Sequence, residues 1–162
     1  PKWVKHYIDT YNILNKDNLS LLAEIYDRDV SFTDPLSHIS GLNELERYFL
    51  HLYENLKSCQ FVVSEVFIDR LGLNDNKQGS NNDEQTKERA ALYWSMTMQH
   101  TKINQGREIS VNGHSRLIAV DGKVINQVDY FDVATMIYEH IPLLGGAIKF
   151  IKNKASHQIS AS

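Results

Sequence analysis

The 162-residue chain has one cysteine, Cys59, and only three prolines. A single cysteine excludes an intrachain disulfide and any CxxC metal or redox site. Lys and Arg number 17 against 20 Asp and Glu, so there is no basic excess to neutralise a phosphate backbone. Nucleic acid is therefore not an expected partner. The seven histidines show no HExxH spacing, and we predict neither a metal nor a cofactor.

The sequence also lacks a long hydrophobic run. The longest apolar stretch, residues 141–151, contains Lys149 and is shorter than the ~20 residues that span a bilayer. No signal peptide is visible, although the chain begins at Pro1 without a methionine, which leaves a removed leader open. Because the low cysteine content suits a reducing compartment, we predict a cytoplasmic protein.

The chain length suits one domain, and its periodicity changes part-way along. Apolar residues recur at helical spacing over 3–14, 19–26 and 42–56, and a short strand at 30–33 ends at Asp34-Pro35. From Cys59 onward the pattern predicts strands at about 60–69, 89–103, 107–120 and 123–132, with a long polar loop at 72–88. Helices followed by antiparallel strands indicate an α+β fold, with the helices on one face of the sheet.

A last helical stretch begins near Val133 and leads into residues 141–154, where apolar residues alternate with lysines. We divide the chain into a domain at 1–140 and an amphipathic extension and tail at 141–162. The extension is expected to dock on its own domain or on a second subunit. Contact with an anionic membrane is the less favoured alternative.

The dipeptide Asp121-Gly122 lies between two alternating runs and predicts a two-residue β-hairpin turn of type I′. Counting outward from that turn pairs Val120 with Lys123, Ile118 with Ile125, Arg116 with Gln127 and His114 with Asp129. One face then carries His114, Arg116, Ile118, Ile125, Gln127, Asp129 and Phe131. The other face carries Val111, Leu117, Ala119, Val124, Val128 and Tyr130.

A histidine opposite a carboxylate is an acid–base unit, because the carboxylate orients the ring and raises its pKa. Arg116 beside this pair would hold an oxyanion or a substrate carboxylate. The alternative is that the His114 face is simply the solvated face of an antiparallel sheet.

Trp94 does not settle which face is buried. If Gln105-Gly106 is a two-residue turn, Trp94 shares the face of Leu117. If the loop has three residues, Asn104-Gln105-Gly106, Trp94 falls opposite Arg116, on the His114 face. Both alternatives stay open at this point.

The order of elements, the FTDP stretch at 32–35 and the INQVDYFD stretch at 125–132 resemble the SnoaL-like branch of the NTF2-like superfamily, over roughly residues 3–140. That superfamily includes ketosteroid isomerases and limonene epoxide hydrolases. The resemblance implies a cone: a strongly curved antiparallel sheet wrapped on three N-terminal helices, here with an extra C-terminal helix. The polar face would be concave and line a pocket, and the apolar face would pack in a homodimer through the sheet.

The resemblance also implies site residues. Asp34 falls where ketosteroid isomerases keep the proton-shuttling aspartate of an Asp-Pro pair, although an aspartate before proline is equally a common turn residue. The oxyanion-binding groups of those isomerases match poorly, whereas the His and Asp set of SnoaL-type polyketide cyclases is the least contradicted. The expected catalytic residues are Asp34, His114 and Asp129. The expected substrate-binding residues are Arg116, Gln127, Trp94, Met96, Phe131, Tyr11 and Phe49.

These expectations define two functional hypotheses. The first is a pocket for a small hydrophobic organic molecule, with cofactor-independent acid–base catalysis of isomerase, cyclase or hydrolase type. The alternative is a non-catalytic ligand-binding module or a dimeric protein-interaction module. The sequence leaves open whether the chain is an enzyme.

Overall fold

A computed structural model describes residues 1–69, 87–136 and 153 of the chain. Most of the predicted 72–88 loop and the predicted 141–162 extension, apart from Asn153, lie outside these residues. The helical elements are α1 (Lys2–Ile13), η1 (Leu19–Leu21), α2 (Leu22–Ile25), α3 (Leu42–Tyr53), η3 (Asn104–Gly106) and α4 (Val133–Met136). The strands are β1 (Tyr26–Thr33), β2 (His38–Ser40), β3 (Leu56–Asp69), β4 (Lys87–His100), β5 (Glu108–Val120) and β6 (Lys123–Phe131).

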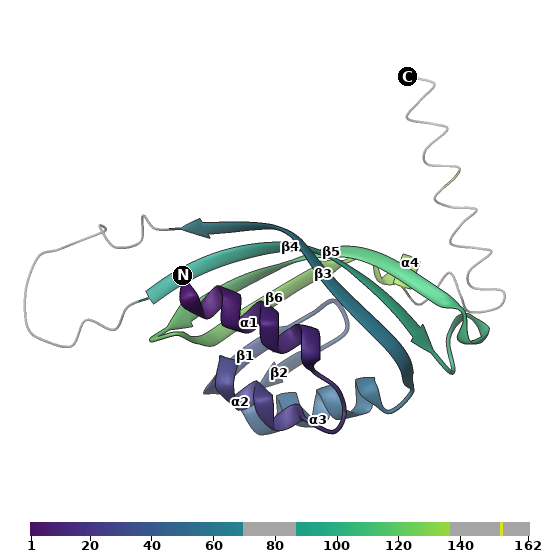
Figure 1. The fold of residues 1–162 in the computed structure, drawn as a ribbon, viewed down its shortest axis with the longest axis horizontal. Coiled ribbons are helices and arrows are strands. Elements are labelled where there is room, and N and C mark those ends of the chain that lie inside the picture. Colours follow the sequence, from purple (N-terminus) through teal and green to yellow (C-terminus); the bar gives the residue numbers. More distant parts are fainter. Residues whose placement is uncertain (70–86, 137–152, 154–162) are drawn as a thin grey trace, which may run out of the picture.

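The strands form one curved, unclosed sheet in the order β2-β1-β6-β5-β4-β3. The helices α1, α2 and α3 lie beneath its concave side (Figure 1). The α+β cone expected from the sequence is therefore confirmed, with one correction to the sheet. Strands β3 to β6 are antiparallel in succession, but β1 runs parallel to β6. The elements α1, η1 and α2 precede β1, and α3 lies between β2 and β3. The first residue of β1, Tyr26, is predicted from the sequence to be helical, and this is wrong.

The hydrophobic core lies between the helices and the concave side of the sheet. Trp3, Val4 and Tyr7 of α1 and Leu45 of α3 are buried there, with sheet residues such as Leu117 opposite them. The apolar stripes of α1 and α3 recur at the three- to four-residue spacing that places them on one side of a helix. Within the described ranges, no helix combines the length and apolar character needed to span a bilayer.

The predicted turn at Asp121-Gly122 is confirmed. Both residues have positive φ, 50° and 82°, as a type I′ turn requires, and Val120 faces Lys123. The register predicted beyond the turn is wrong, however, because Ile125 is an extra residue in β6. The observed partners are Ala119 and Val124, Ile118 and Asn126, Leu117 and Gln127, Arg116 and Val128, Ser115 and Asp129, and His114 and Tyr130.

This β-bulge reverses the orientation of every later side chain in β6 relative to β5, because successive residues of a strand point to opposite faces. Asp129 consequently lies beside Ser115, on the concave face, and not beside His114. His114 lies on the convex face. Its ring stacks between Tyr93 and Tyr130, with centroid distances of 5.4 and 4.6 Å.

The position of Trp94 is resolved by its pairing with Gly113. This register places Trp94 on the Leu117 face, which is the concave one. The loop itself is longer than either alternative allowed, since Asn104, Gln105 and Gly106 all have positive φ and Gln99 is the last β4 residue paired with β5. A Cβ at Gly113 would lie 2.4 Å from Cη2 of Trp94, so the absence of a side chain there is what lets the indole lie against β5.

Candidate functional site

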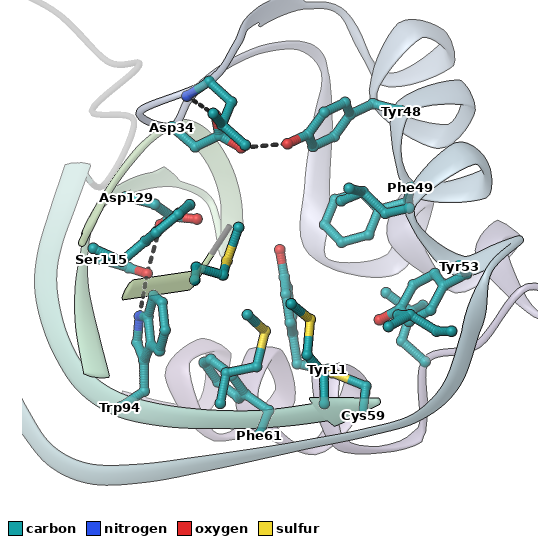
Figure 2. A pocket seen from close by; sticks show the side chains of 18 of the residues that line it. Tyr11, Asp34, Tyr48, Phe49, Tyr53, Cys59, Phe61, Trp94, Ser115 and Asp129 are labelled. Atoms are coloured by element: carbon teal, nitrogen blue, oxygen red, sulfur yellow. Dashed lines mark hydrogen bonds between the residues drawn. The ribbon is translucent and has the colours of Figure 1, made fainter. Parts of the chain in front are cut away.

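A cavity of about 600 Å³ lies between the concave face of the sheet and helices α1 and α3. Figure 2 shows two carboxylates, Asp34 and Asp129, at one part of its wall, and Tyr53 and Cys59 elsewhere on it. Its lining is predominantly aromatic and aliphatic, with a few polar groups. Such a composition is typical of sites for small organic molecules.

The aromatic part of the lining is a chain of neighbouring rings, which we call the aromatic belt: Trp94, Phe61, Tyr11, Phe49 and Tyr53. Successive ring centroids along this belt are 5.4, 5.7, 6.0 and 6.1 Å apart. These separations are those of favourable aromatic pairs. The belt comes from β4, β3, α1 and α3, so the concave sheet and the helices build the cavity together.

Asp129 is held by two groups, Ser115 and Gln127, which donate to its carboxyl oxygens. The Ser115 hydroxyl donates to Oδ1 at 2.6 Å, and the Gln127 amide nitrogen lies 2.9 and 3.0 Å from Oδ1 and Oδ2. Trp94 Nε1 donates to the Ser115 oxygen at 2.9 Å, which commits the Ser115 proton to Asp129 (Figure 2). The carboxyl orientation is thus fixed, while Oδ2 keeps free lone-pair capacity.

Behind Asp129, a buried network fixes the orientation of Gln127. The amide oxygen of Gln127 accepts hydrogen bonds from Tyr7 at 2.9 Å and from Tyr26 at 2.5 Å. Because the Tyr26 proton is used there, Tyr11 donates to the Tyr26 hydroxyl. Burial is the main cause that raises the pKa of Tyr7, Tyr11 and Tyr26 above the ordinary value. The tyrosines therefore stay protonated and act as donors.

The same surroundings change the acidity of Asp129. Burial raises its pKa to about 6, and the charge of Asp34 adds to this, whereas the hydrogen bonds from Ser115 and Gln127 act in the opposite direction. A carboxyl with a pKa near neutrality is present in both protonation states around physiological pH. It can therefore accept a proton and give it back.

Asp34 follows β1 and serves two purposes at once. Its Oδ1 accepts the backbone N–H groups of Leu36 and Ser37, each at 2.7 Å, which is the turn role expected of an aspartate before proline. Its Oδ2 accepts the Tyr48 hydroxyl from α3, and Asp34 also lines the cavity. Burial and the bond to Asp34 raise the pKa of Tyr48.

The structure places eight of the ten predicted site residues in the cavity wall: Asp34, Asp129, Gln127, Trp94, Met96, Phe131, Tyr11 and Phe49. It does not bring His114 and Arg116 to that wall. Both lie on the convex face of β5, whereas the bulge at Ile125 places Asp129 opposite Ser115 on the concave face. The predicted His114–Asp129 pair is therefore corrected to Ser115–Asp129.

The sequence prediction missed Ser115, Tyr48, Tyr7 and Tyr26 as site residues. The sequence did contain a local signal for the register that brings Ser115 to Asp129. In β6 the alternation of apolar and polar residues is broken by two apolar residues, Val124-Ile125, followed by two polar ones, Asn126-Gln127. Such doubling is typical of a bulge. No group of three or more His, Cys, Asp or Glu side chains in the described part of the chain is arranged to hold a metal ion.

Residues 4–127 match the family model of the SnoaL-like domain. The chain belongs to the SnoaL-like family. Because this match covers most of the chain, the resemblance noted in the sequence is confirmed. No curated protein sequence matches this SnoaL-like chain.

Solved structures agree with this assignment at the level of fold. A proposed SnoaL-like polyketide cyclase from Jannaschia sp. CCS1 is 11% identical, with a TM-score of 0.64 over 83% of this chain and 88% of the other. A hypothetical protein with a ketosteroid isomerase-like fold from Catenulispora acidiphila, in complex with trimethylamine, is 8% identical, with a TM-score of 0.63 over 86% and 92%. AclR from Streptomyces galilaeus, a proposed hydroxylase, is 16% identical, with a TM-score of 0.57 over 83% and 90%.

Proposed function

We propose that this SnoaL-like protein binds a hydrophobic organic molecule in the cavity and transfers a proton on it through Asp129. The observation that carries the proposal is a carboxyl group of raised pKa, held in one orientation by Ser115 and Gln127 and open to an aromatic cavity. The reaction needs no cofactor, since proton removal and return require only one group that changes protonation state.

The pKa of Asp129 indicates that it would act first as a base and then as an acid. With a pKa of about 6, the group is mainly a carboxylate at neutral pH and acts first as a base. After it has accepted a proton it acts as an acid and returns the proton to a second position. Removal and return at two positions constitute an isomerisation, and return after ring closure constitutes a cyclisation. The polyketide cyclase proposed for the Jannaschia neighbour favours a reaction of this type.

Asp34 and Tyr48 would bind and orient the substrate near Asp129. Their mutual hydrogen bond and the two backbone donors to Asp34 hold this pair at the cavity wall. Because this polar pair is fixed at the cavity wall, it would limit the orientations in which a substrate can bind. Binding in a reactive orientation increases the rate of the reaction. His114, predicted from turn counting as a partner in proton transfer, is assigned no role in the cavity.

A non-catalytic role as a ligand-binding module uses the same cavity and differs in one respect. A binder can use a carboxyl to hold its ligand but does not need one with a shifted pKa, whereas the observed Asp129 combines burial with a near-neutral pKa. Perturbed carboxyls of this kind concentrate at catalytic sites. The cavity chemistry therefore favours the enzyme over the binder.

The test has two stages. A thermal-shift screen of hydrophobic ketones, phenols and amines first identifies ligands, because a ligand at 100 times its Kd stabilises the fold by about 2.7 kcal/mol. Deuterium incorporation into each bound ligand in D₂O is then followed by NMR. We expect exchange at a carbon position to be accelerated by the wild type and to fall at least ~100-fold in Asp129→Asn.

His114→Ala is the matched control, because it changes a sheet residue on the opposite face. Its exchange rate should stay within about twofold of wild type, as expected for a residue outside the cavity. Binding without any exchange in the wild type would favour the non-catalytic module. Equal exchange in wild type and Asp129→Asn would remove Asp129 from the reaction.

A further inference from the structure

The part of the cavity formed by Asp34 and Asp129 offers hydrogen-bond acceptors, while the donors around it are already used. The Tyr48 proton is committed to Asp34 and the Ser115 proton to Asp129. The Gln127 amide also donates to Asp129. An ionised carboxylate accepts several hydrogen bonds and donates none. A ligand group that reaches these oxygens must therefore bring its own protons.

The charge of the lining has one sign. Asp34 and Asp129 both line the cavity, whereas none of the described residues in its wall is a lysine or an arginine. Two histidines, His51 and His100, are also present. Burial and nearby Lys102 lower the pKa of His100, which favours its neutral form. Both carboxyls line the same cavity, and the charge of Asp34 contributes to the raised pKa of Asp129, so the two groups repel each other. A cation between them would relieve this repulsion, and an anion would increase it.

The aromatic belt also favours a cationic ligand. The π-face of an aromatic ring is electron-rich and attracts ammonium groups, most strongly where water is excluded. Tyr11 and Trp94 belong both to the belt and to the hydrogen-bonded network that ends at Asp129. Rings and carboxylates thus lie around one space, as Figure 2 shows.

We propose that the ligands of this cavity are hydrophobic amines in their protonated form, whose N–H groups point to Asp34 and Asp129 and whose carbon skeleton packs on the aromatic belt. This inference rests on the proposed function, because it uses the same cavity, and it narrows the substrate class. Neutral ligands lose the attraction to the carboxylates, and carboxylate ligands are excluded by them.

Matched triplets of ligands test the inference. Each hydrophobic scaffold, from one to four fused rings, is supplied as its aminomethyl, hydroxymethyl and carboxylate derivative, and Kd is measured by calorimetry at pH 7.5. We expect the amine to bind at least about tenfold more tightly than its alcohol, and the carboxylate to bind more weakly than either. Asp34→Asn and Asp129→Asn should each weaken the amine about tenfold and leave the alcohol within about threefold, since an amide keeps the shape but removes the charge.

Arg116→Ala serves as the control variant, because Arg116 is exposed on the convex face. It should leave all three affinities unchanged. Amine and alcohol binding with equal affinity, or the carboxylate binding most tightly, would overturn the amine class and leave the proposed function intact. If no scaffold binds in any of its three forms, both the amine class and the proposed pocket fail.

Discussion

Strands β4, β5 and β6 carry two very different rows of side chains on their opposite faces. On the concave face, Trp94, Ser115 and Asp129 are linked by hydrogen bonds and enclosed with the aromatic belt. On the convex face, Tyr93, His114 and Tyr130 are stacked as flat rings, and both tyrosines are nearly half exposed, at 46% and 47%.

The difference shows that residue type alone does not make a site. By residue type alone, a histidine between two tyrosines is as well suited to acid–base chemistry as a serine beside an aspartate. Only the second group is enclosed, however, and enclosure raises the pKa of Asp129. Burial and ordered hydrogen-bond partners, more than the identity of the side chains, separate the candidate site from the exposed row.

The most severe way to disturb the concave row is to replace Gln127 with leucine. In Gln127→Leu, Asp129 loses the amide that donates to both of its carboxyl oxygens. The Tyr7 and Tyr26 hydroxyls would lose their common acceptor. We expect a loss of at least ~4 kcal/mol in the free energy of unfolding, measured by urea denaturation.

Ile125→Val is the control for that substitution. It changes a side chain of the same strand that takes no part in the hydrogen bonds of Gln127, and should cost no more than about 1 kcal/mol. A Gln127→Leu variant as stable as this control would mean that the hydrogen bonds of Gln127 do not stabilise the fold.

A smaller effect is expected from Gly113→Ala, which disturbs only the row on the concave face. In Gly113→Ala, the new Cβ would lie 2.4 Å from the Trp94 ring and 2.7 Å from the backbone oxygen of Tyr130. Because one of these neighbours is backbone, we expect destabilisation by about 3 kcal/mol and altered Trp94 fluorescence. Adding Trp94→Phe to Gly113→Ala should recover part of the loss, since a smaller ring removes the first contact. Unchanged stability in Gly113→Ala would contradict the close packing of Trp94 on β5.

The pH dependence of stability follows from Asp129. Its pKa is 3.8 in the ordinary state and about 6 in the folded protein, so the folded state binds the proton more tightly. The resulting stabilisation is complete below the unfolded pKa and is lost as the pH rises through about 6. We expect the unfolding free energy of the wild type to fall by about 2 kcal/mol relative to Asp129→Asn between pH 4 and 7. Parallel curves for the two proteins would show that burial does not perturb this carboxyl.

The smallest effect on the folded chain is expected at the convex row, where the prediction of a homodimer through the sheet is still to be tested. Phe67, Tyr93 and Tyr130 are exposed on the strands of this face. Tyr93→Glu and Tyr130→Glu should change the unfolding free energy of the monomer by no more than ~0.5 kcal/mol. The same variants should convert a dimer to a monomer in light scattering after size exclusion. A wild type that is monomeric at all concentrations would refute the dimer.

Much of the fold could be predicted from the sequence because its signals are local. Helical spacing in α1 and α3 and the Asp121-Gly122 turn depend on residues within a few positions of each other. The candidate site depends on contacts between residues that are far apart in the sequence. The bulge at Ile125 interrupts the pairing of β6 with β5 and also coincides with a shift in its pairing with β1. Counting outward from the Asp121-Gly122 turn considers only the pairing of β6 with β5 and leaves out its pairing with β1.

The tyrosines behind Gln127 illustrate the same limit. Tyr7 and Tyr26 are 120 and 101 positions from Gln127 in the chain, and both meet its amide oxygen in the folded core. Aromatic residues at helical spacing usually serve as packing, and nothing in their local sequence distinguishes a ring whose hydroxyl is needed. Asp34 is predicted through the resemblance to ketosteroid isomerases, and Asp129 through counting outward from the Asp121-Gly122 turn, which gives Asp129 the wrong partner.

The extra residue at Ile125 has a consequence for comparing relatives by sequence. Residues 123–124 and 126–131 of β6 are in opposite inward–outward phase, so an alignment without a gap at position 125 equates Asp129 with outward-facing residues of any relative that lacks the bulge. Homologous acids would then appear to be missing where they are only displaced by one column. Family alignments that place a one-residue gap at this position should recover an inward acid on β6 in more members of the family.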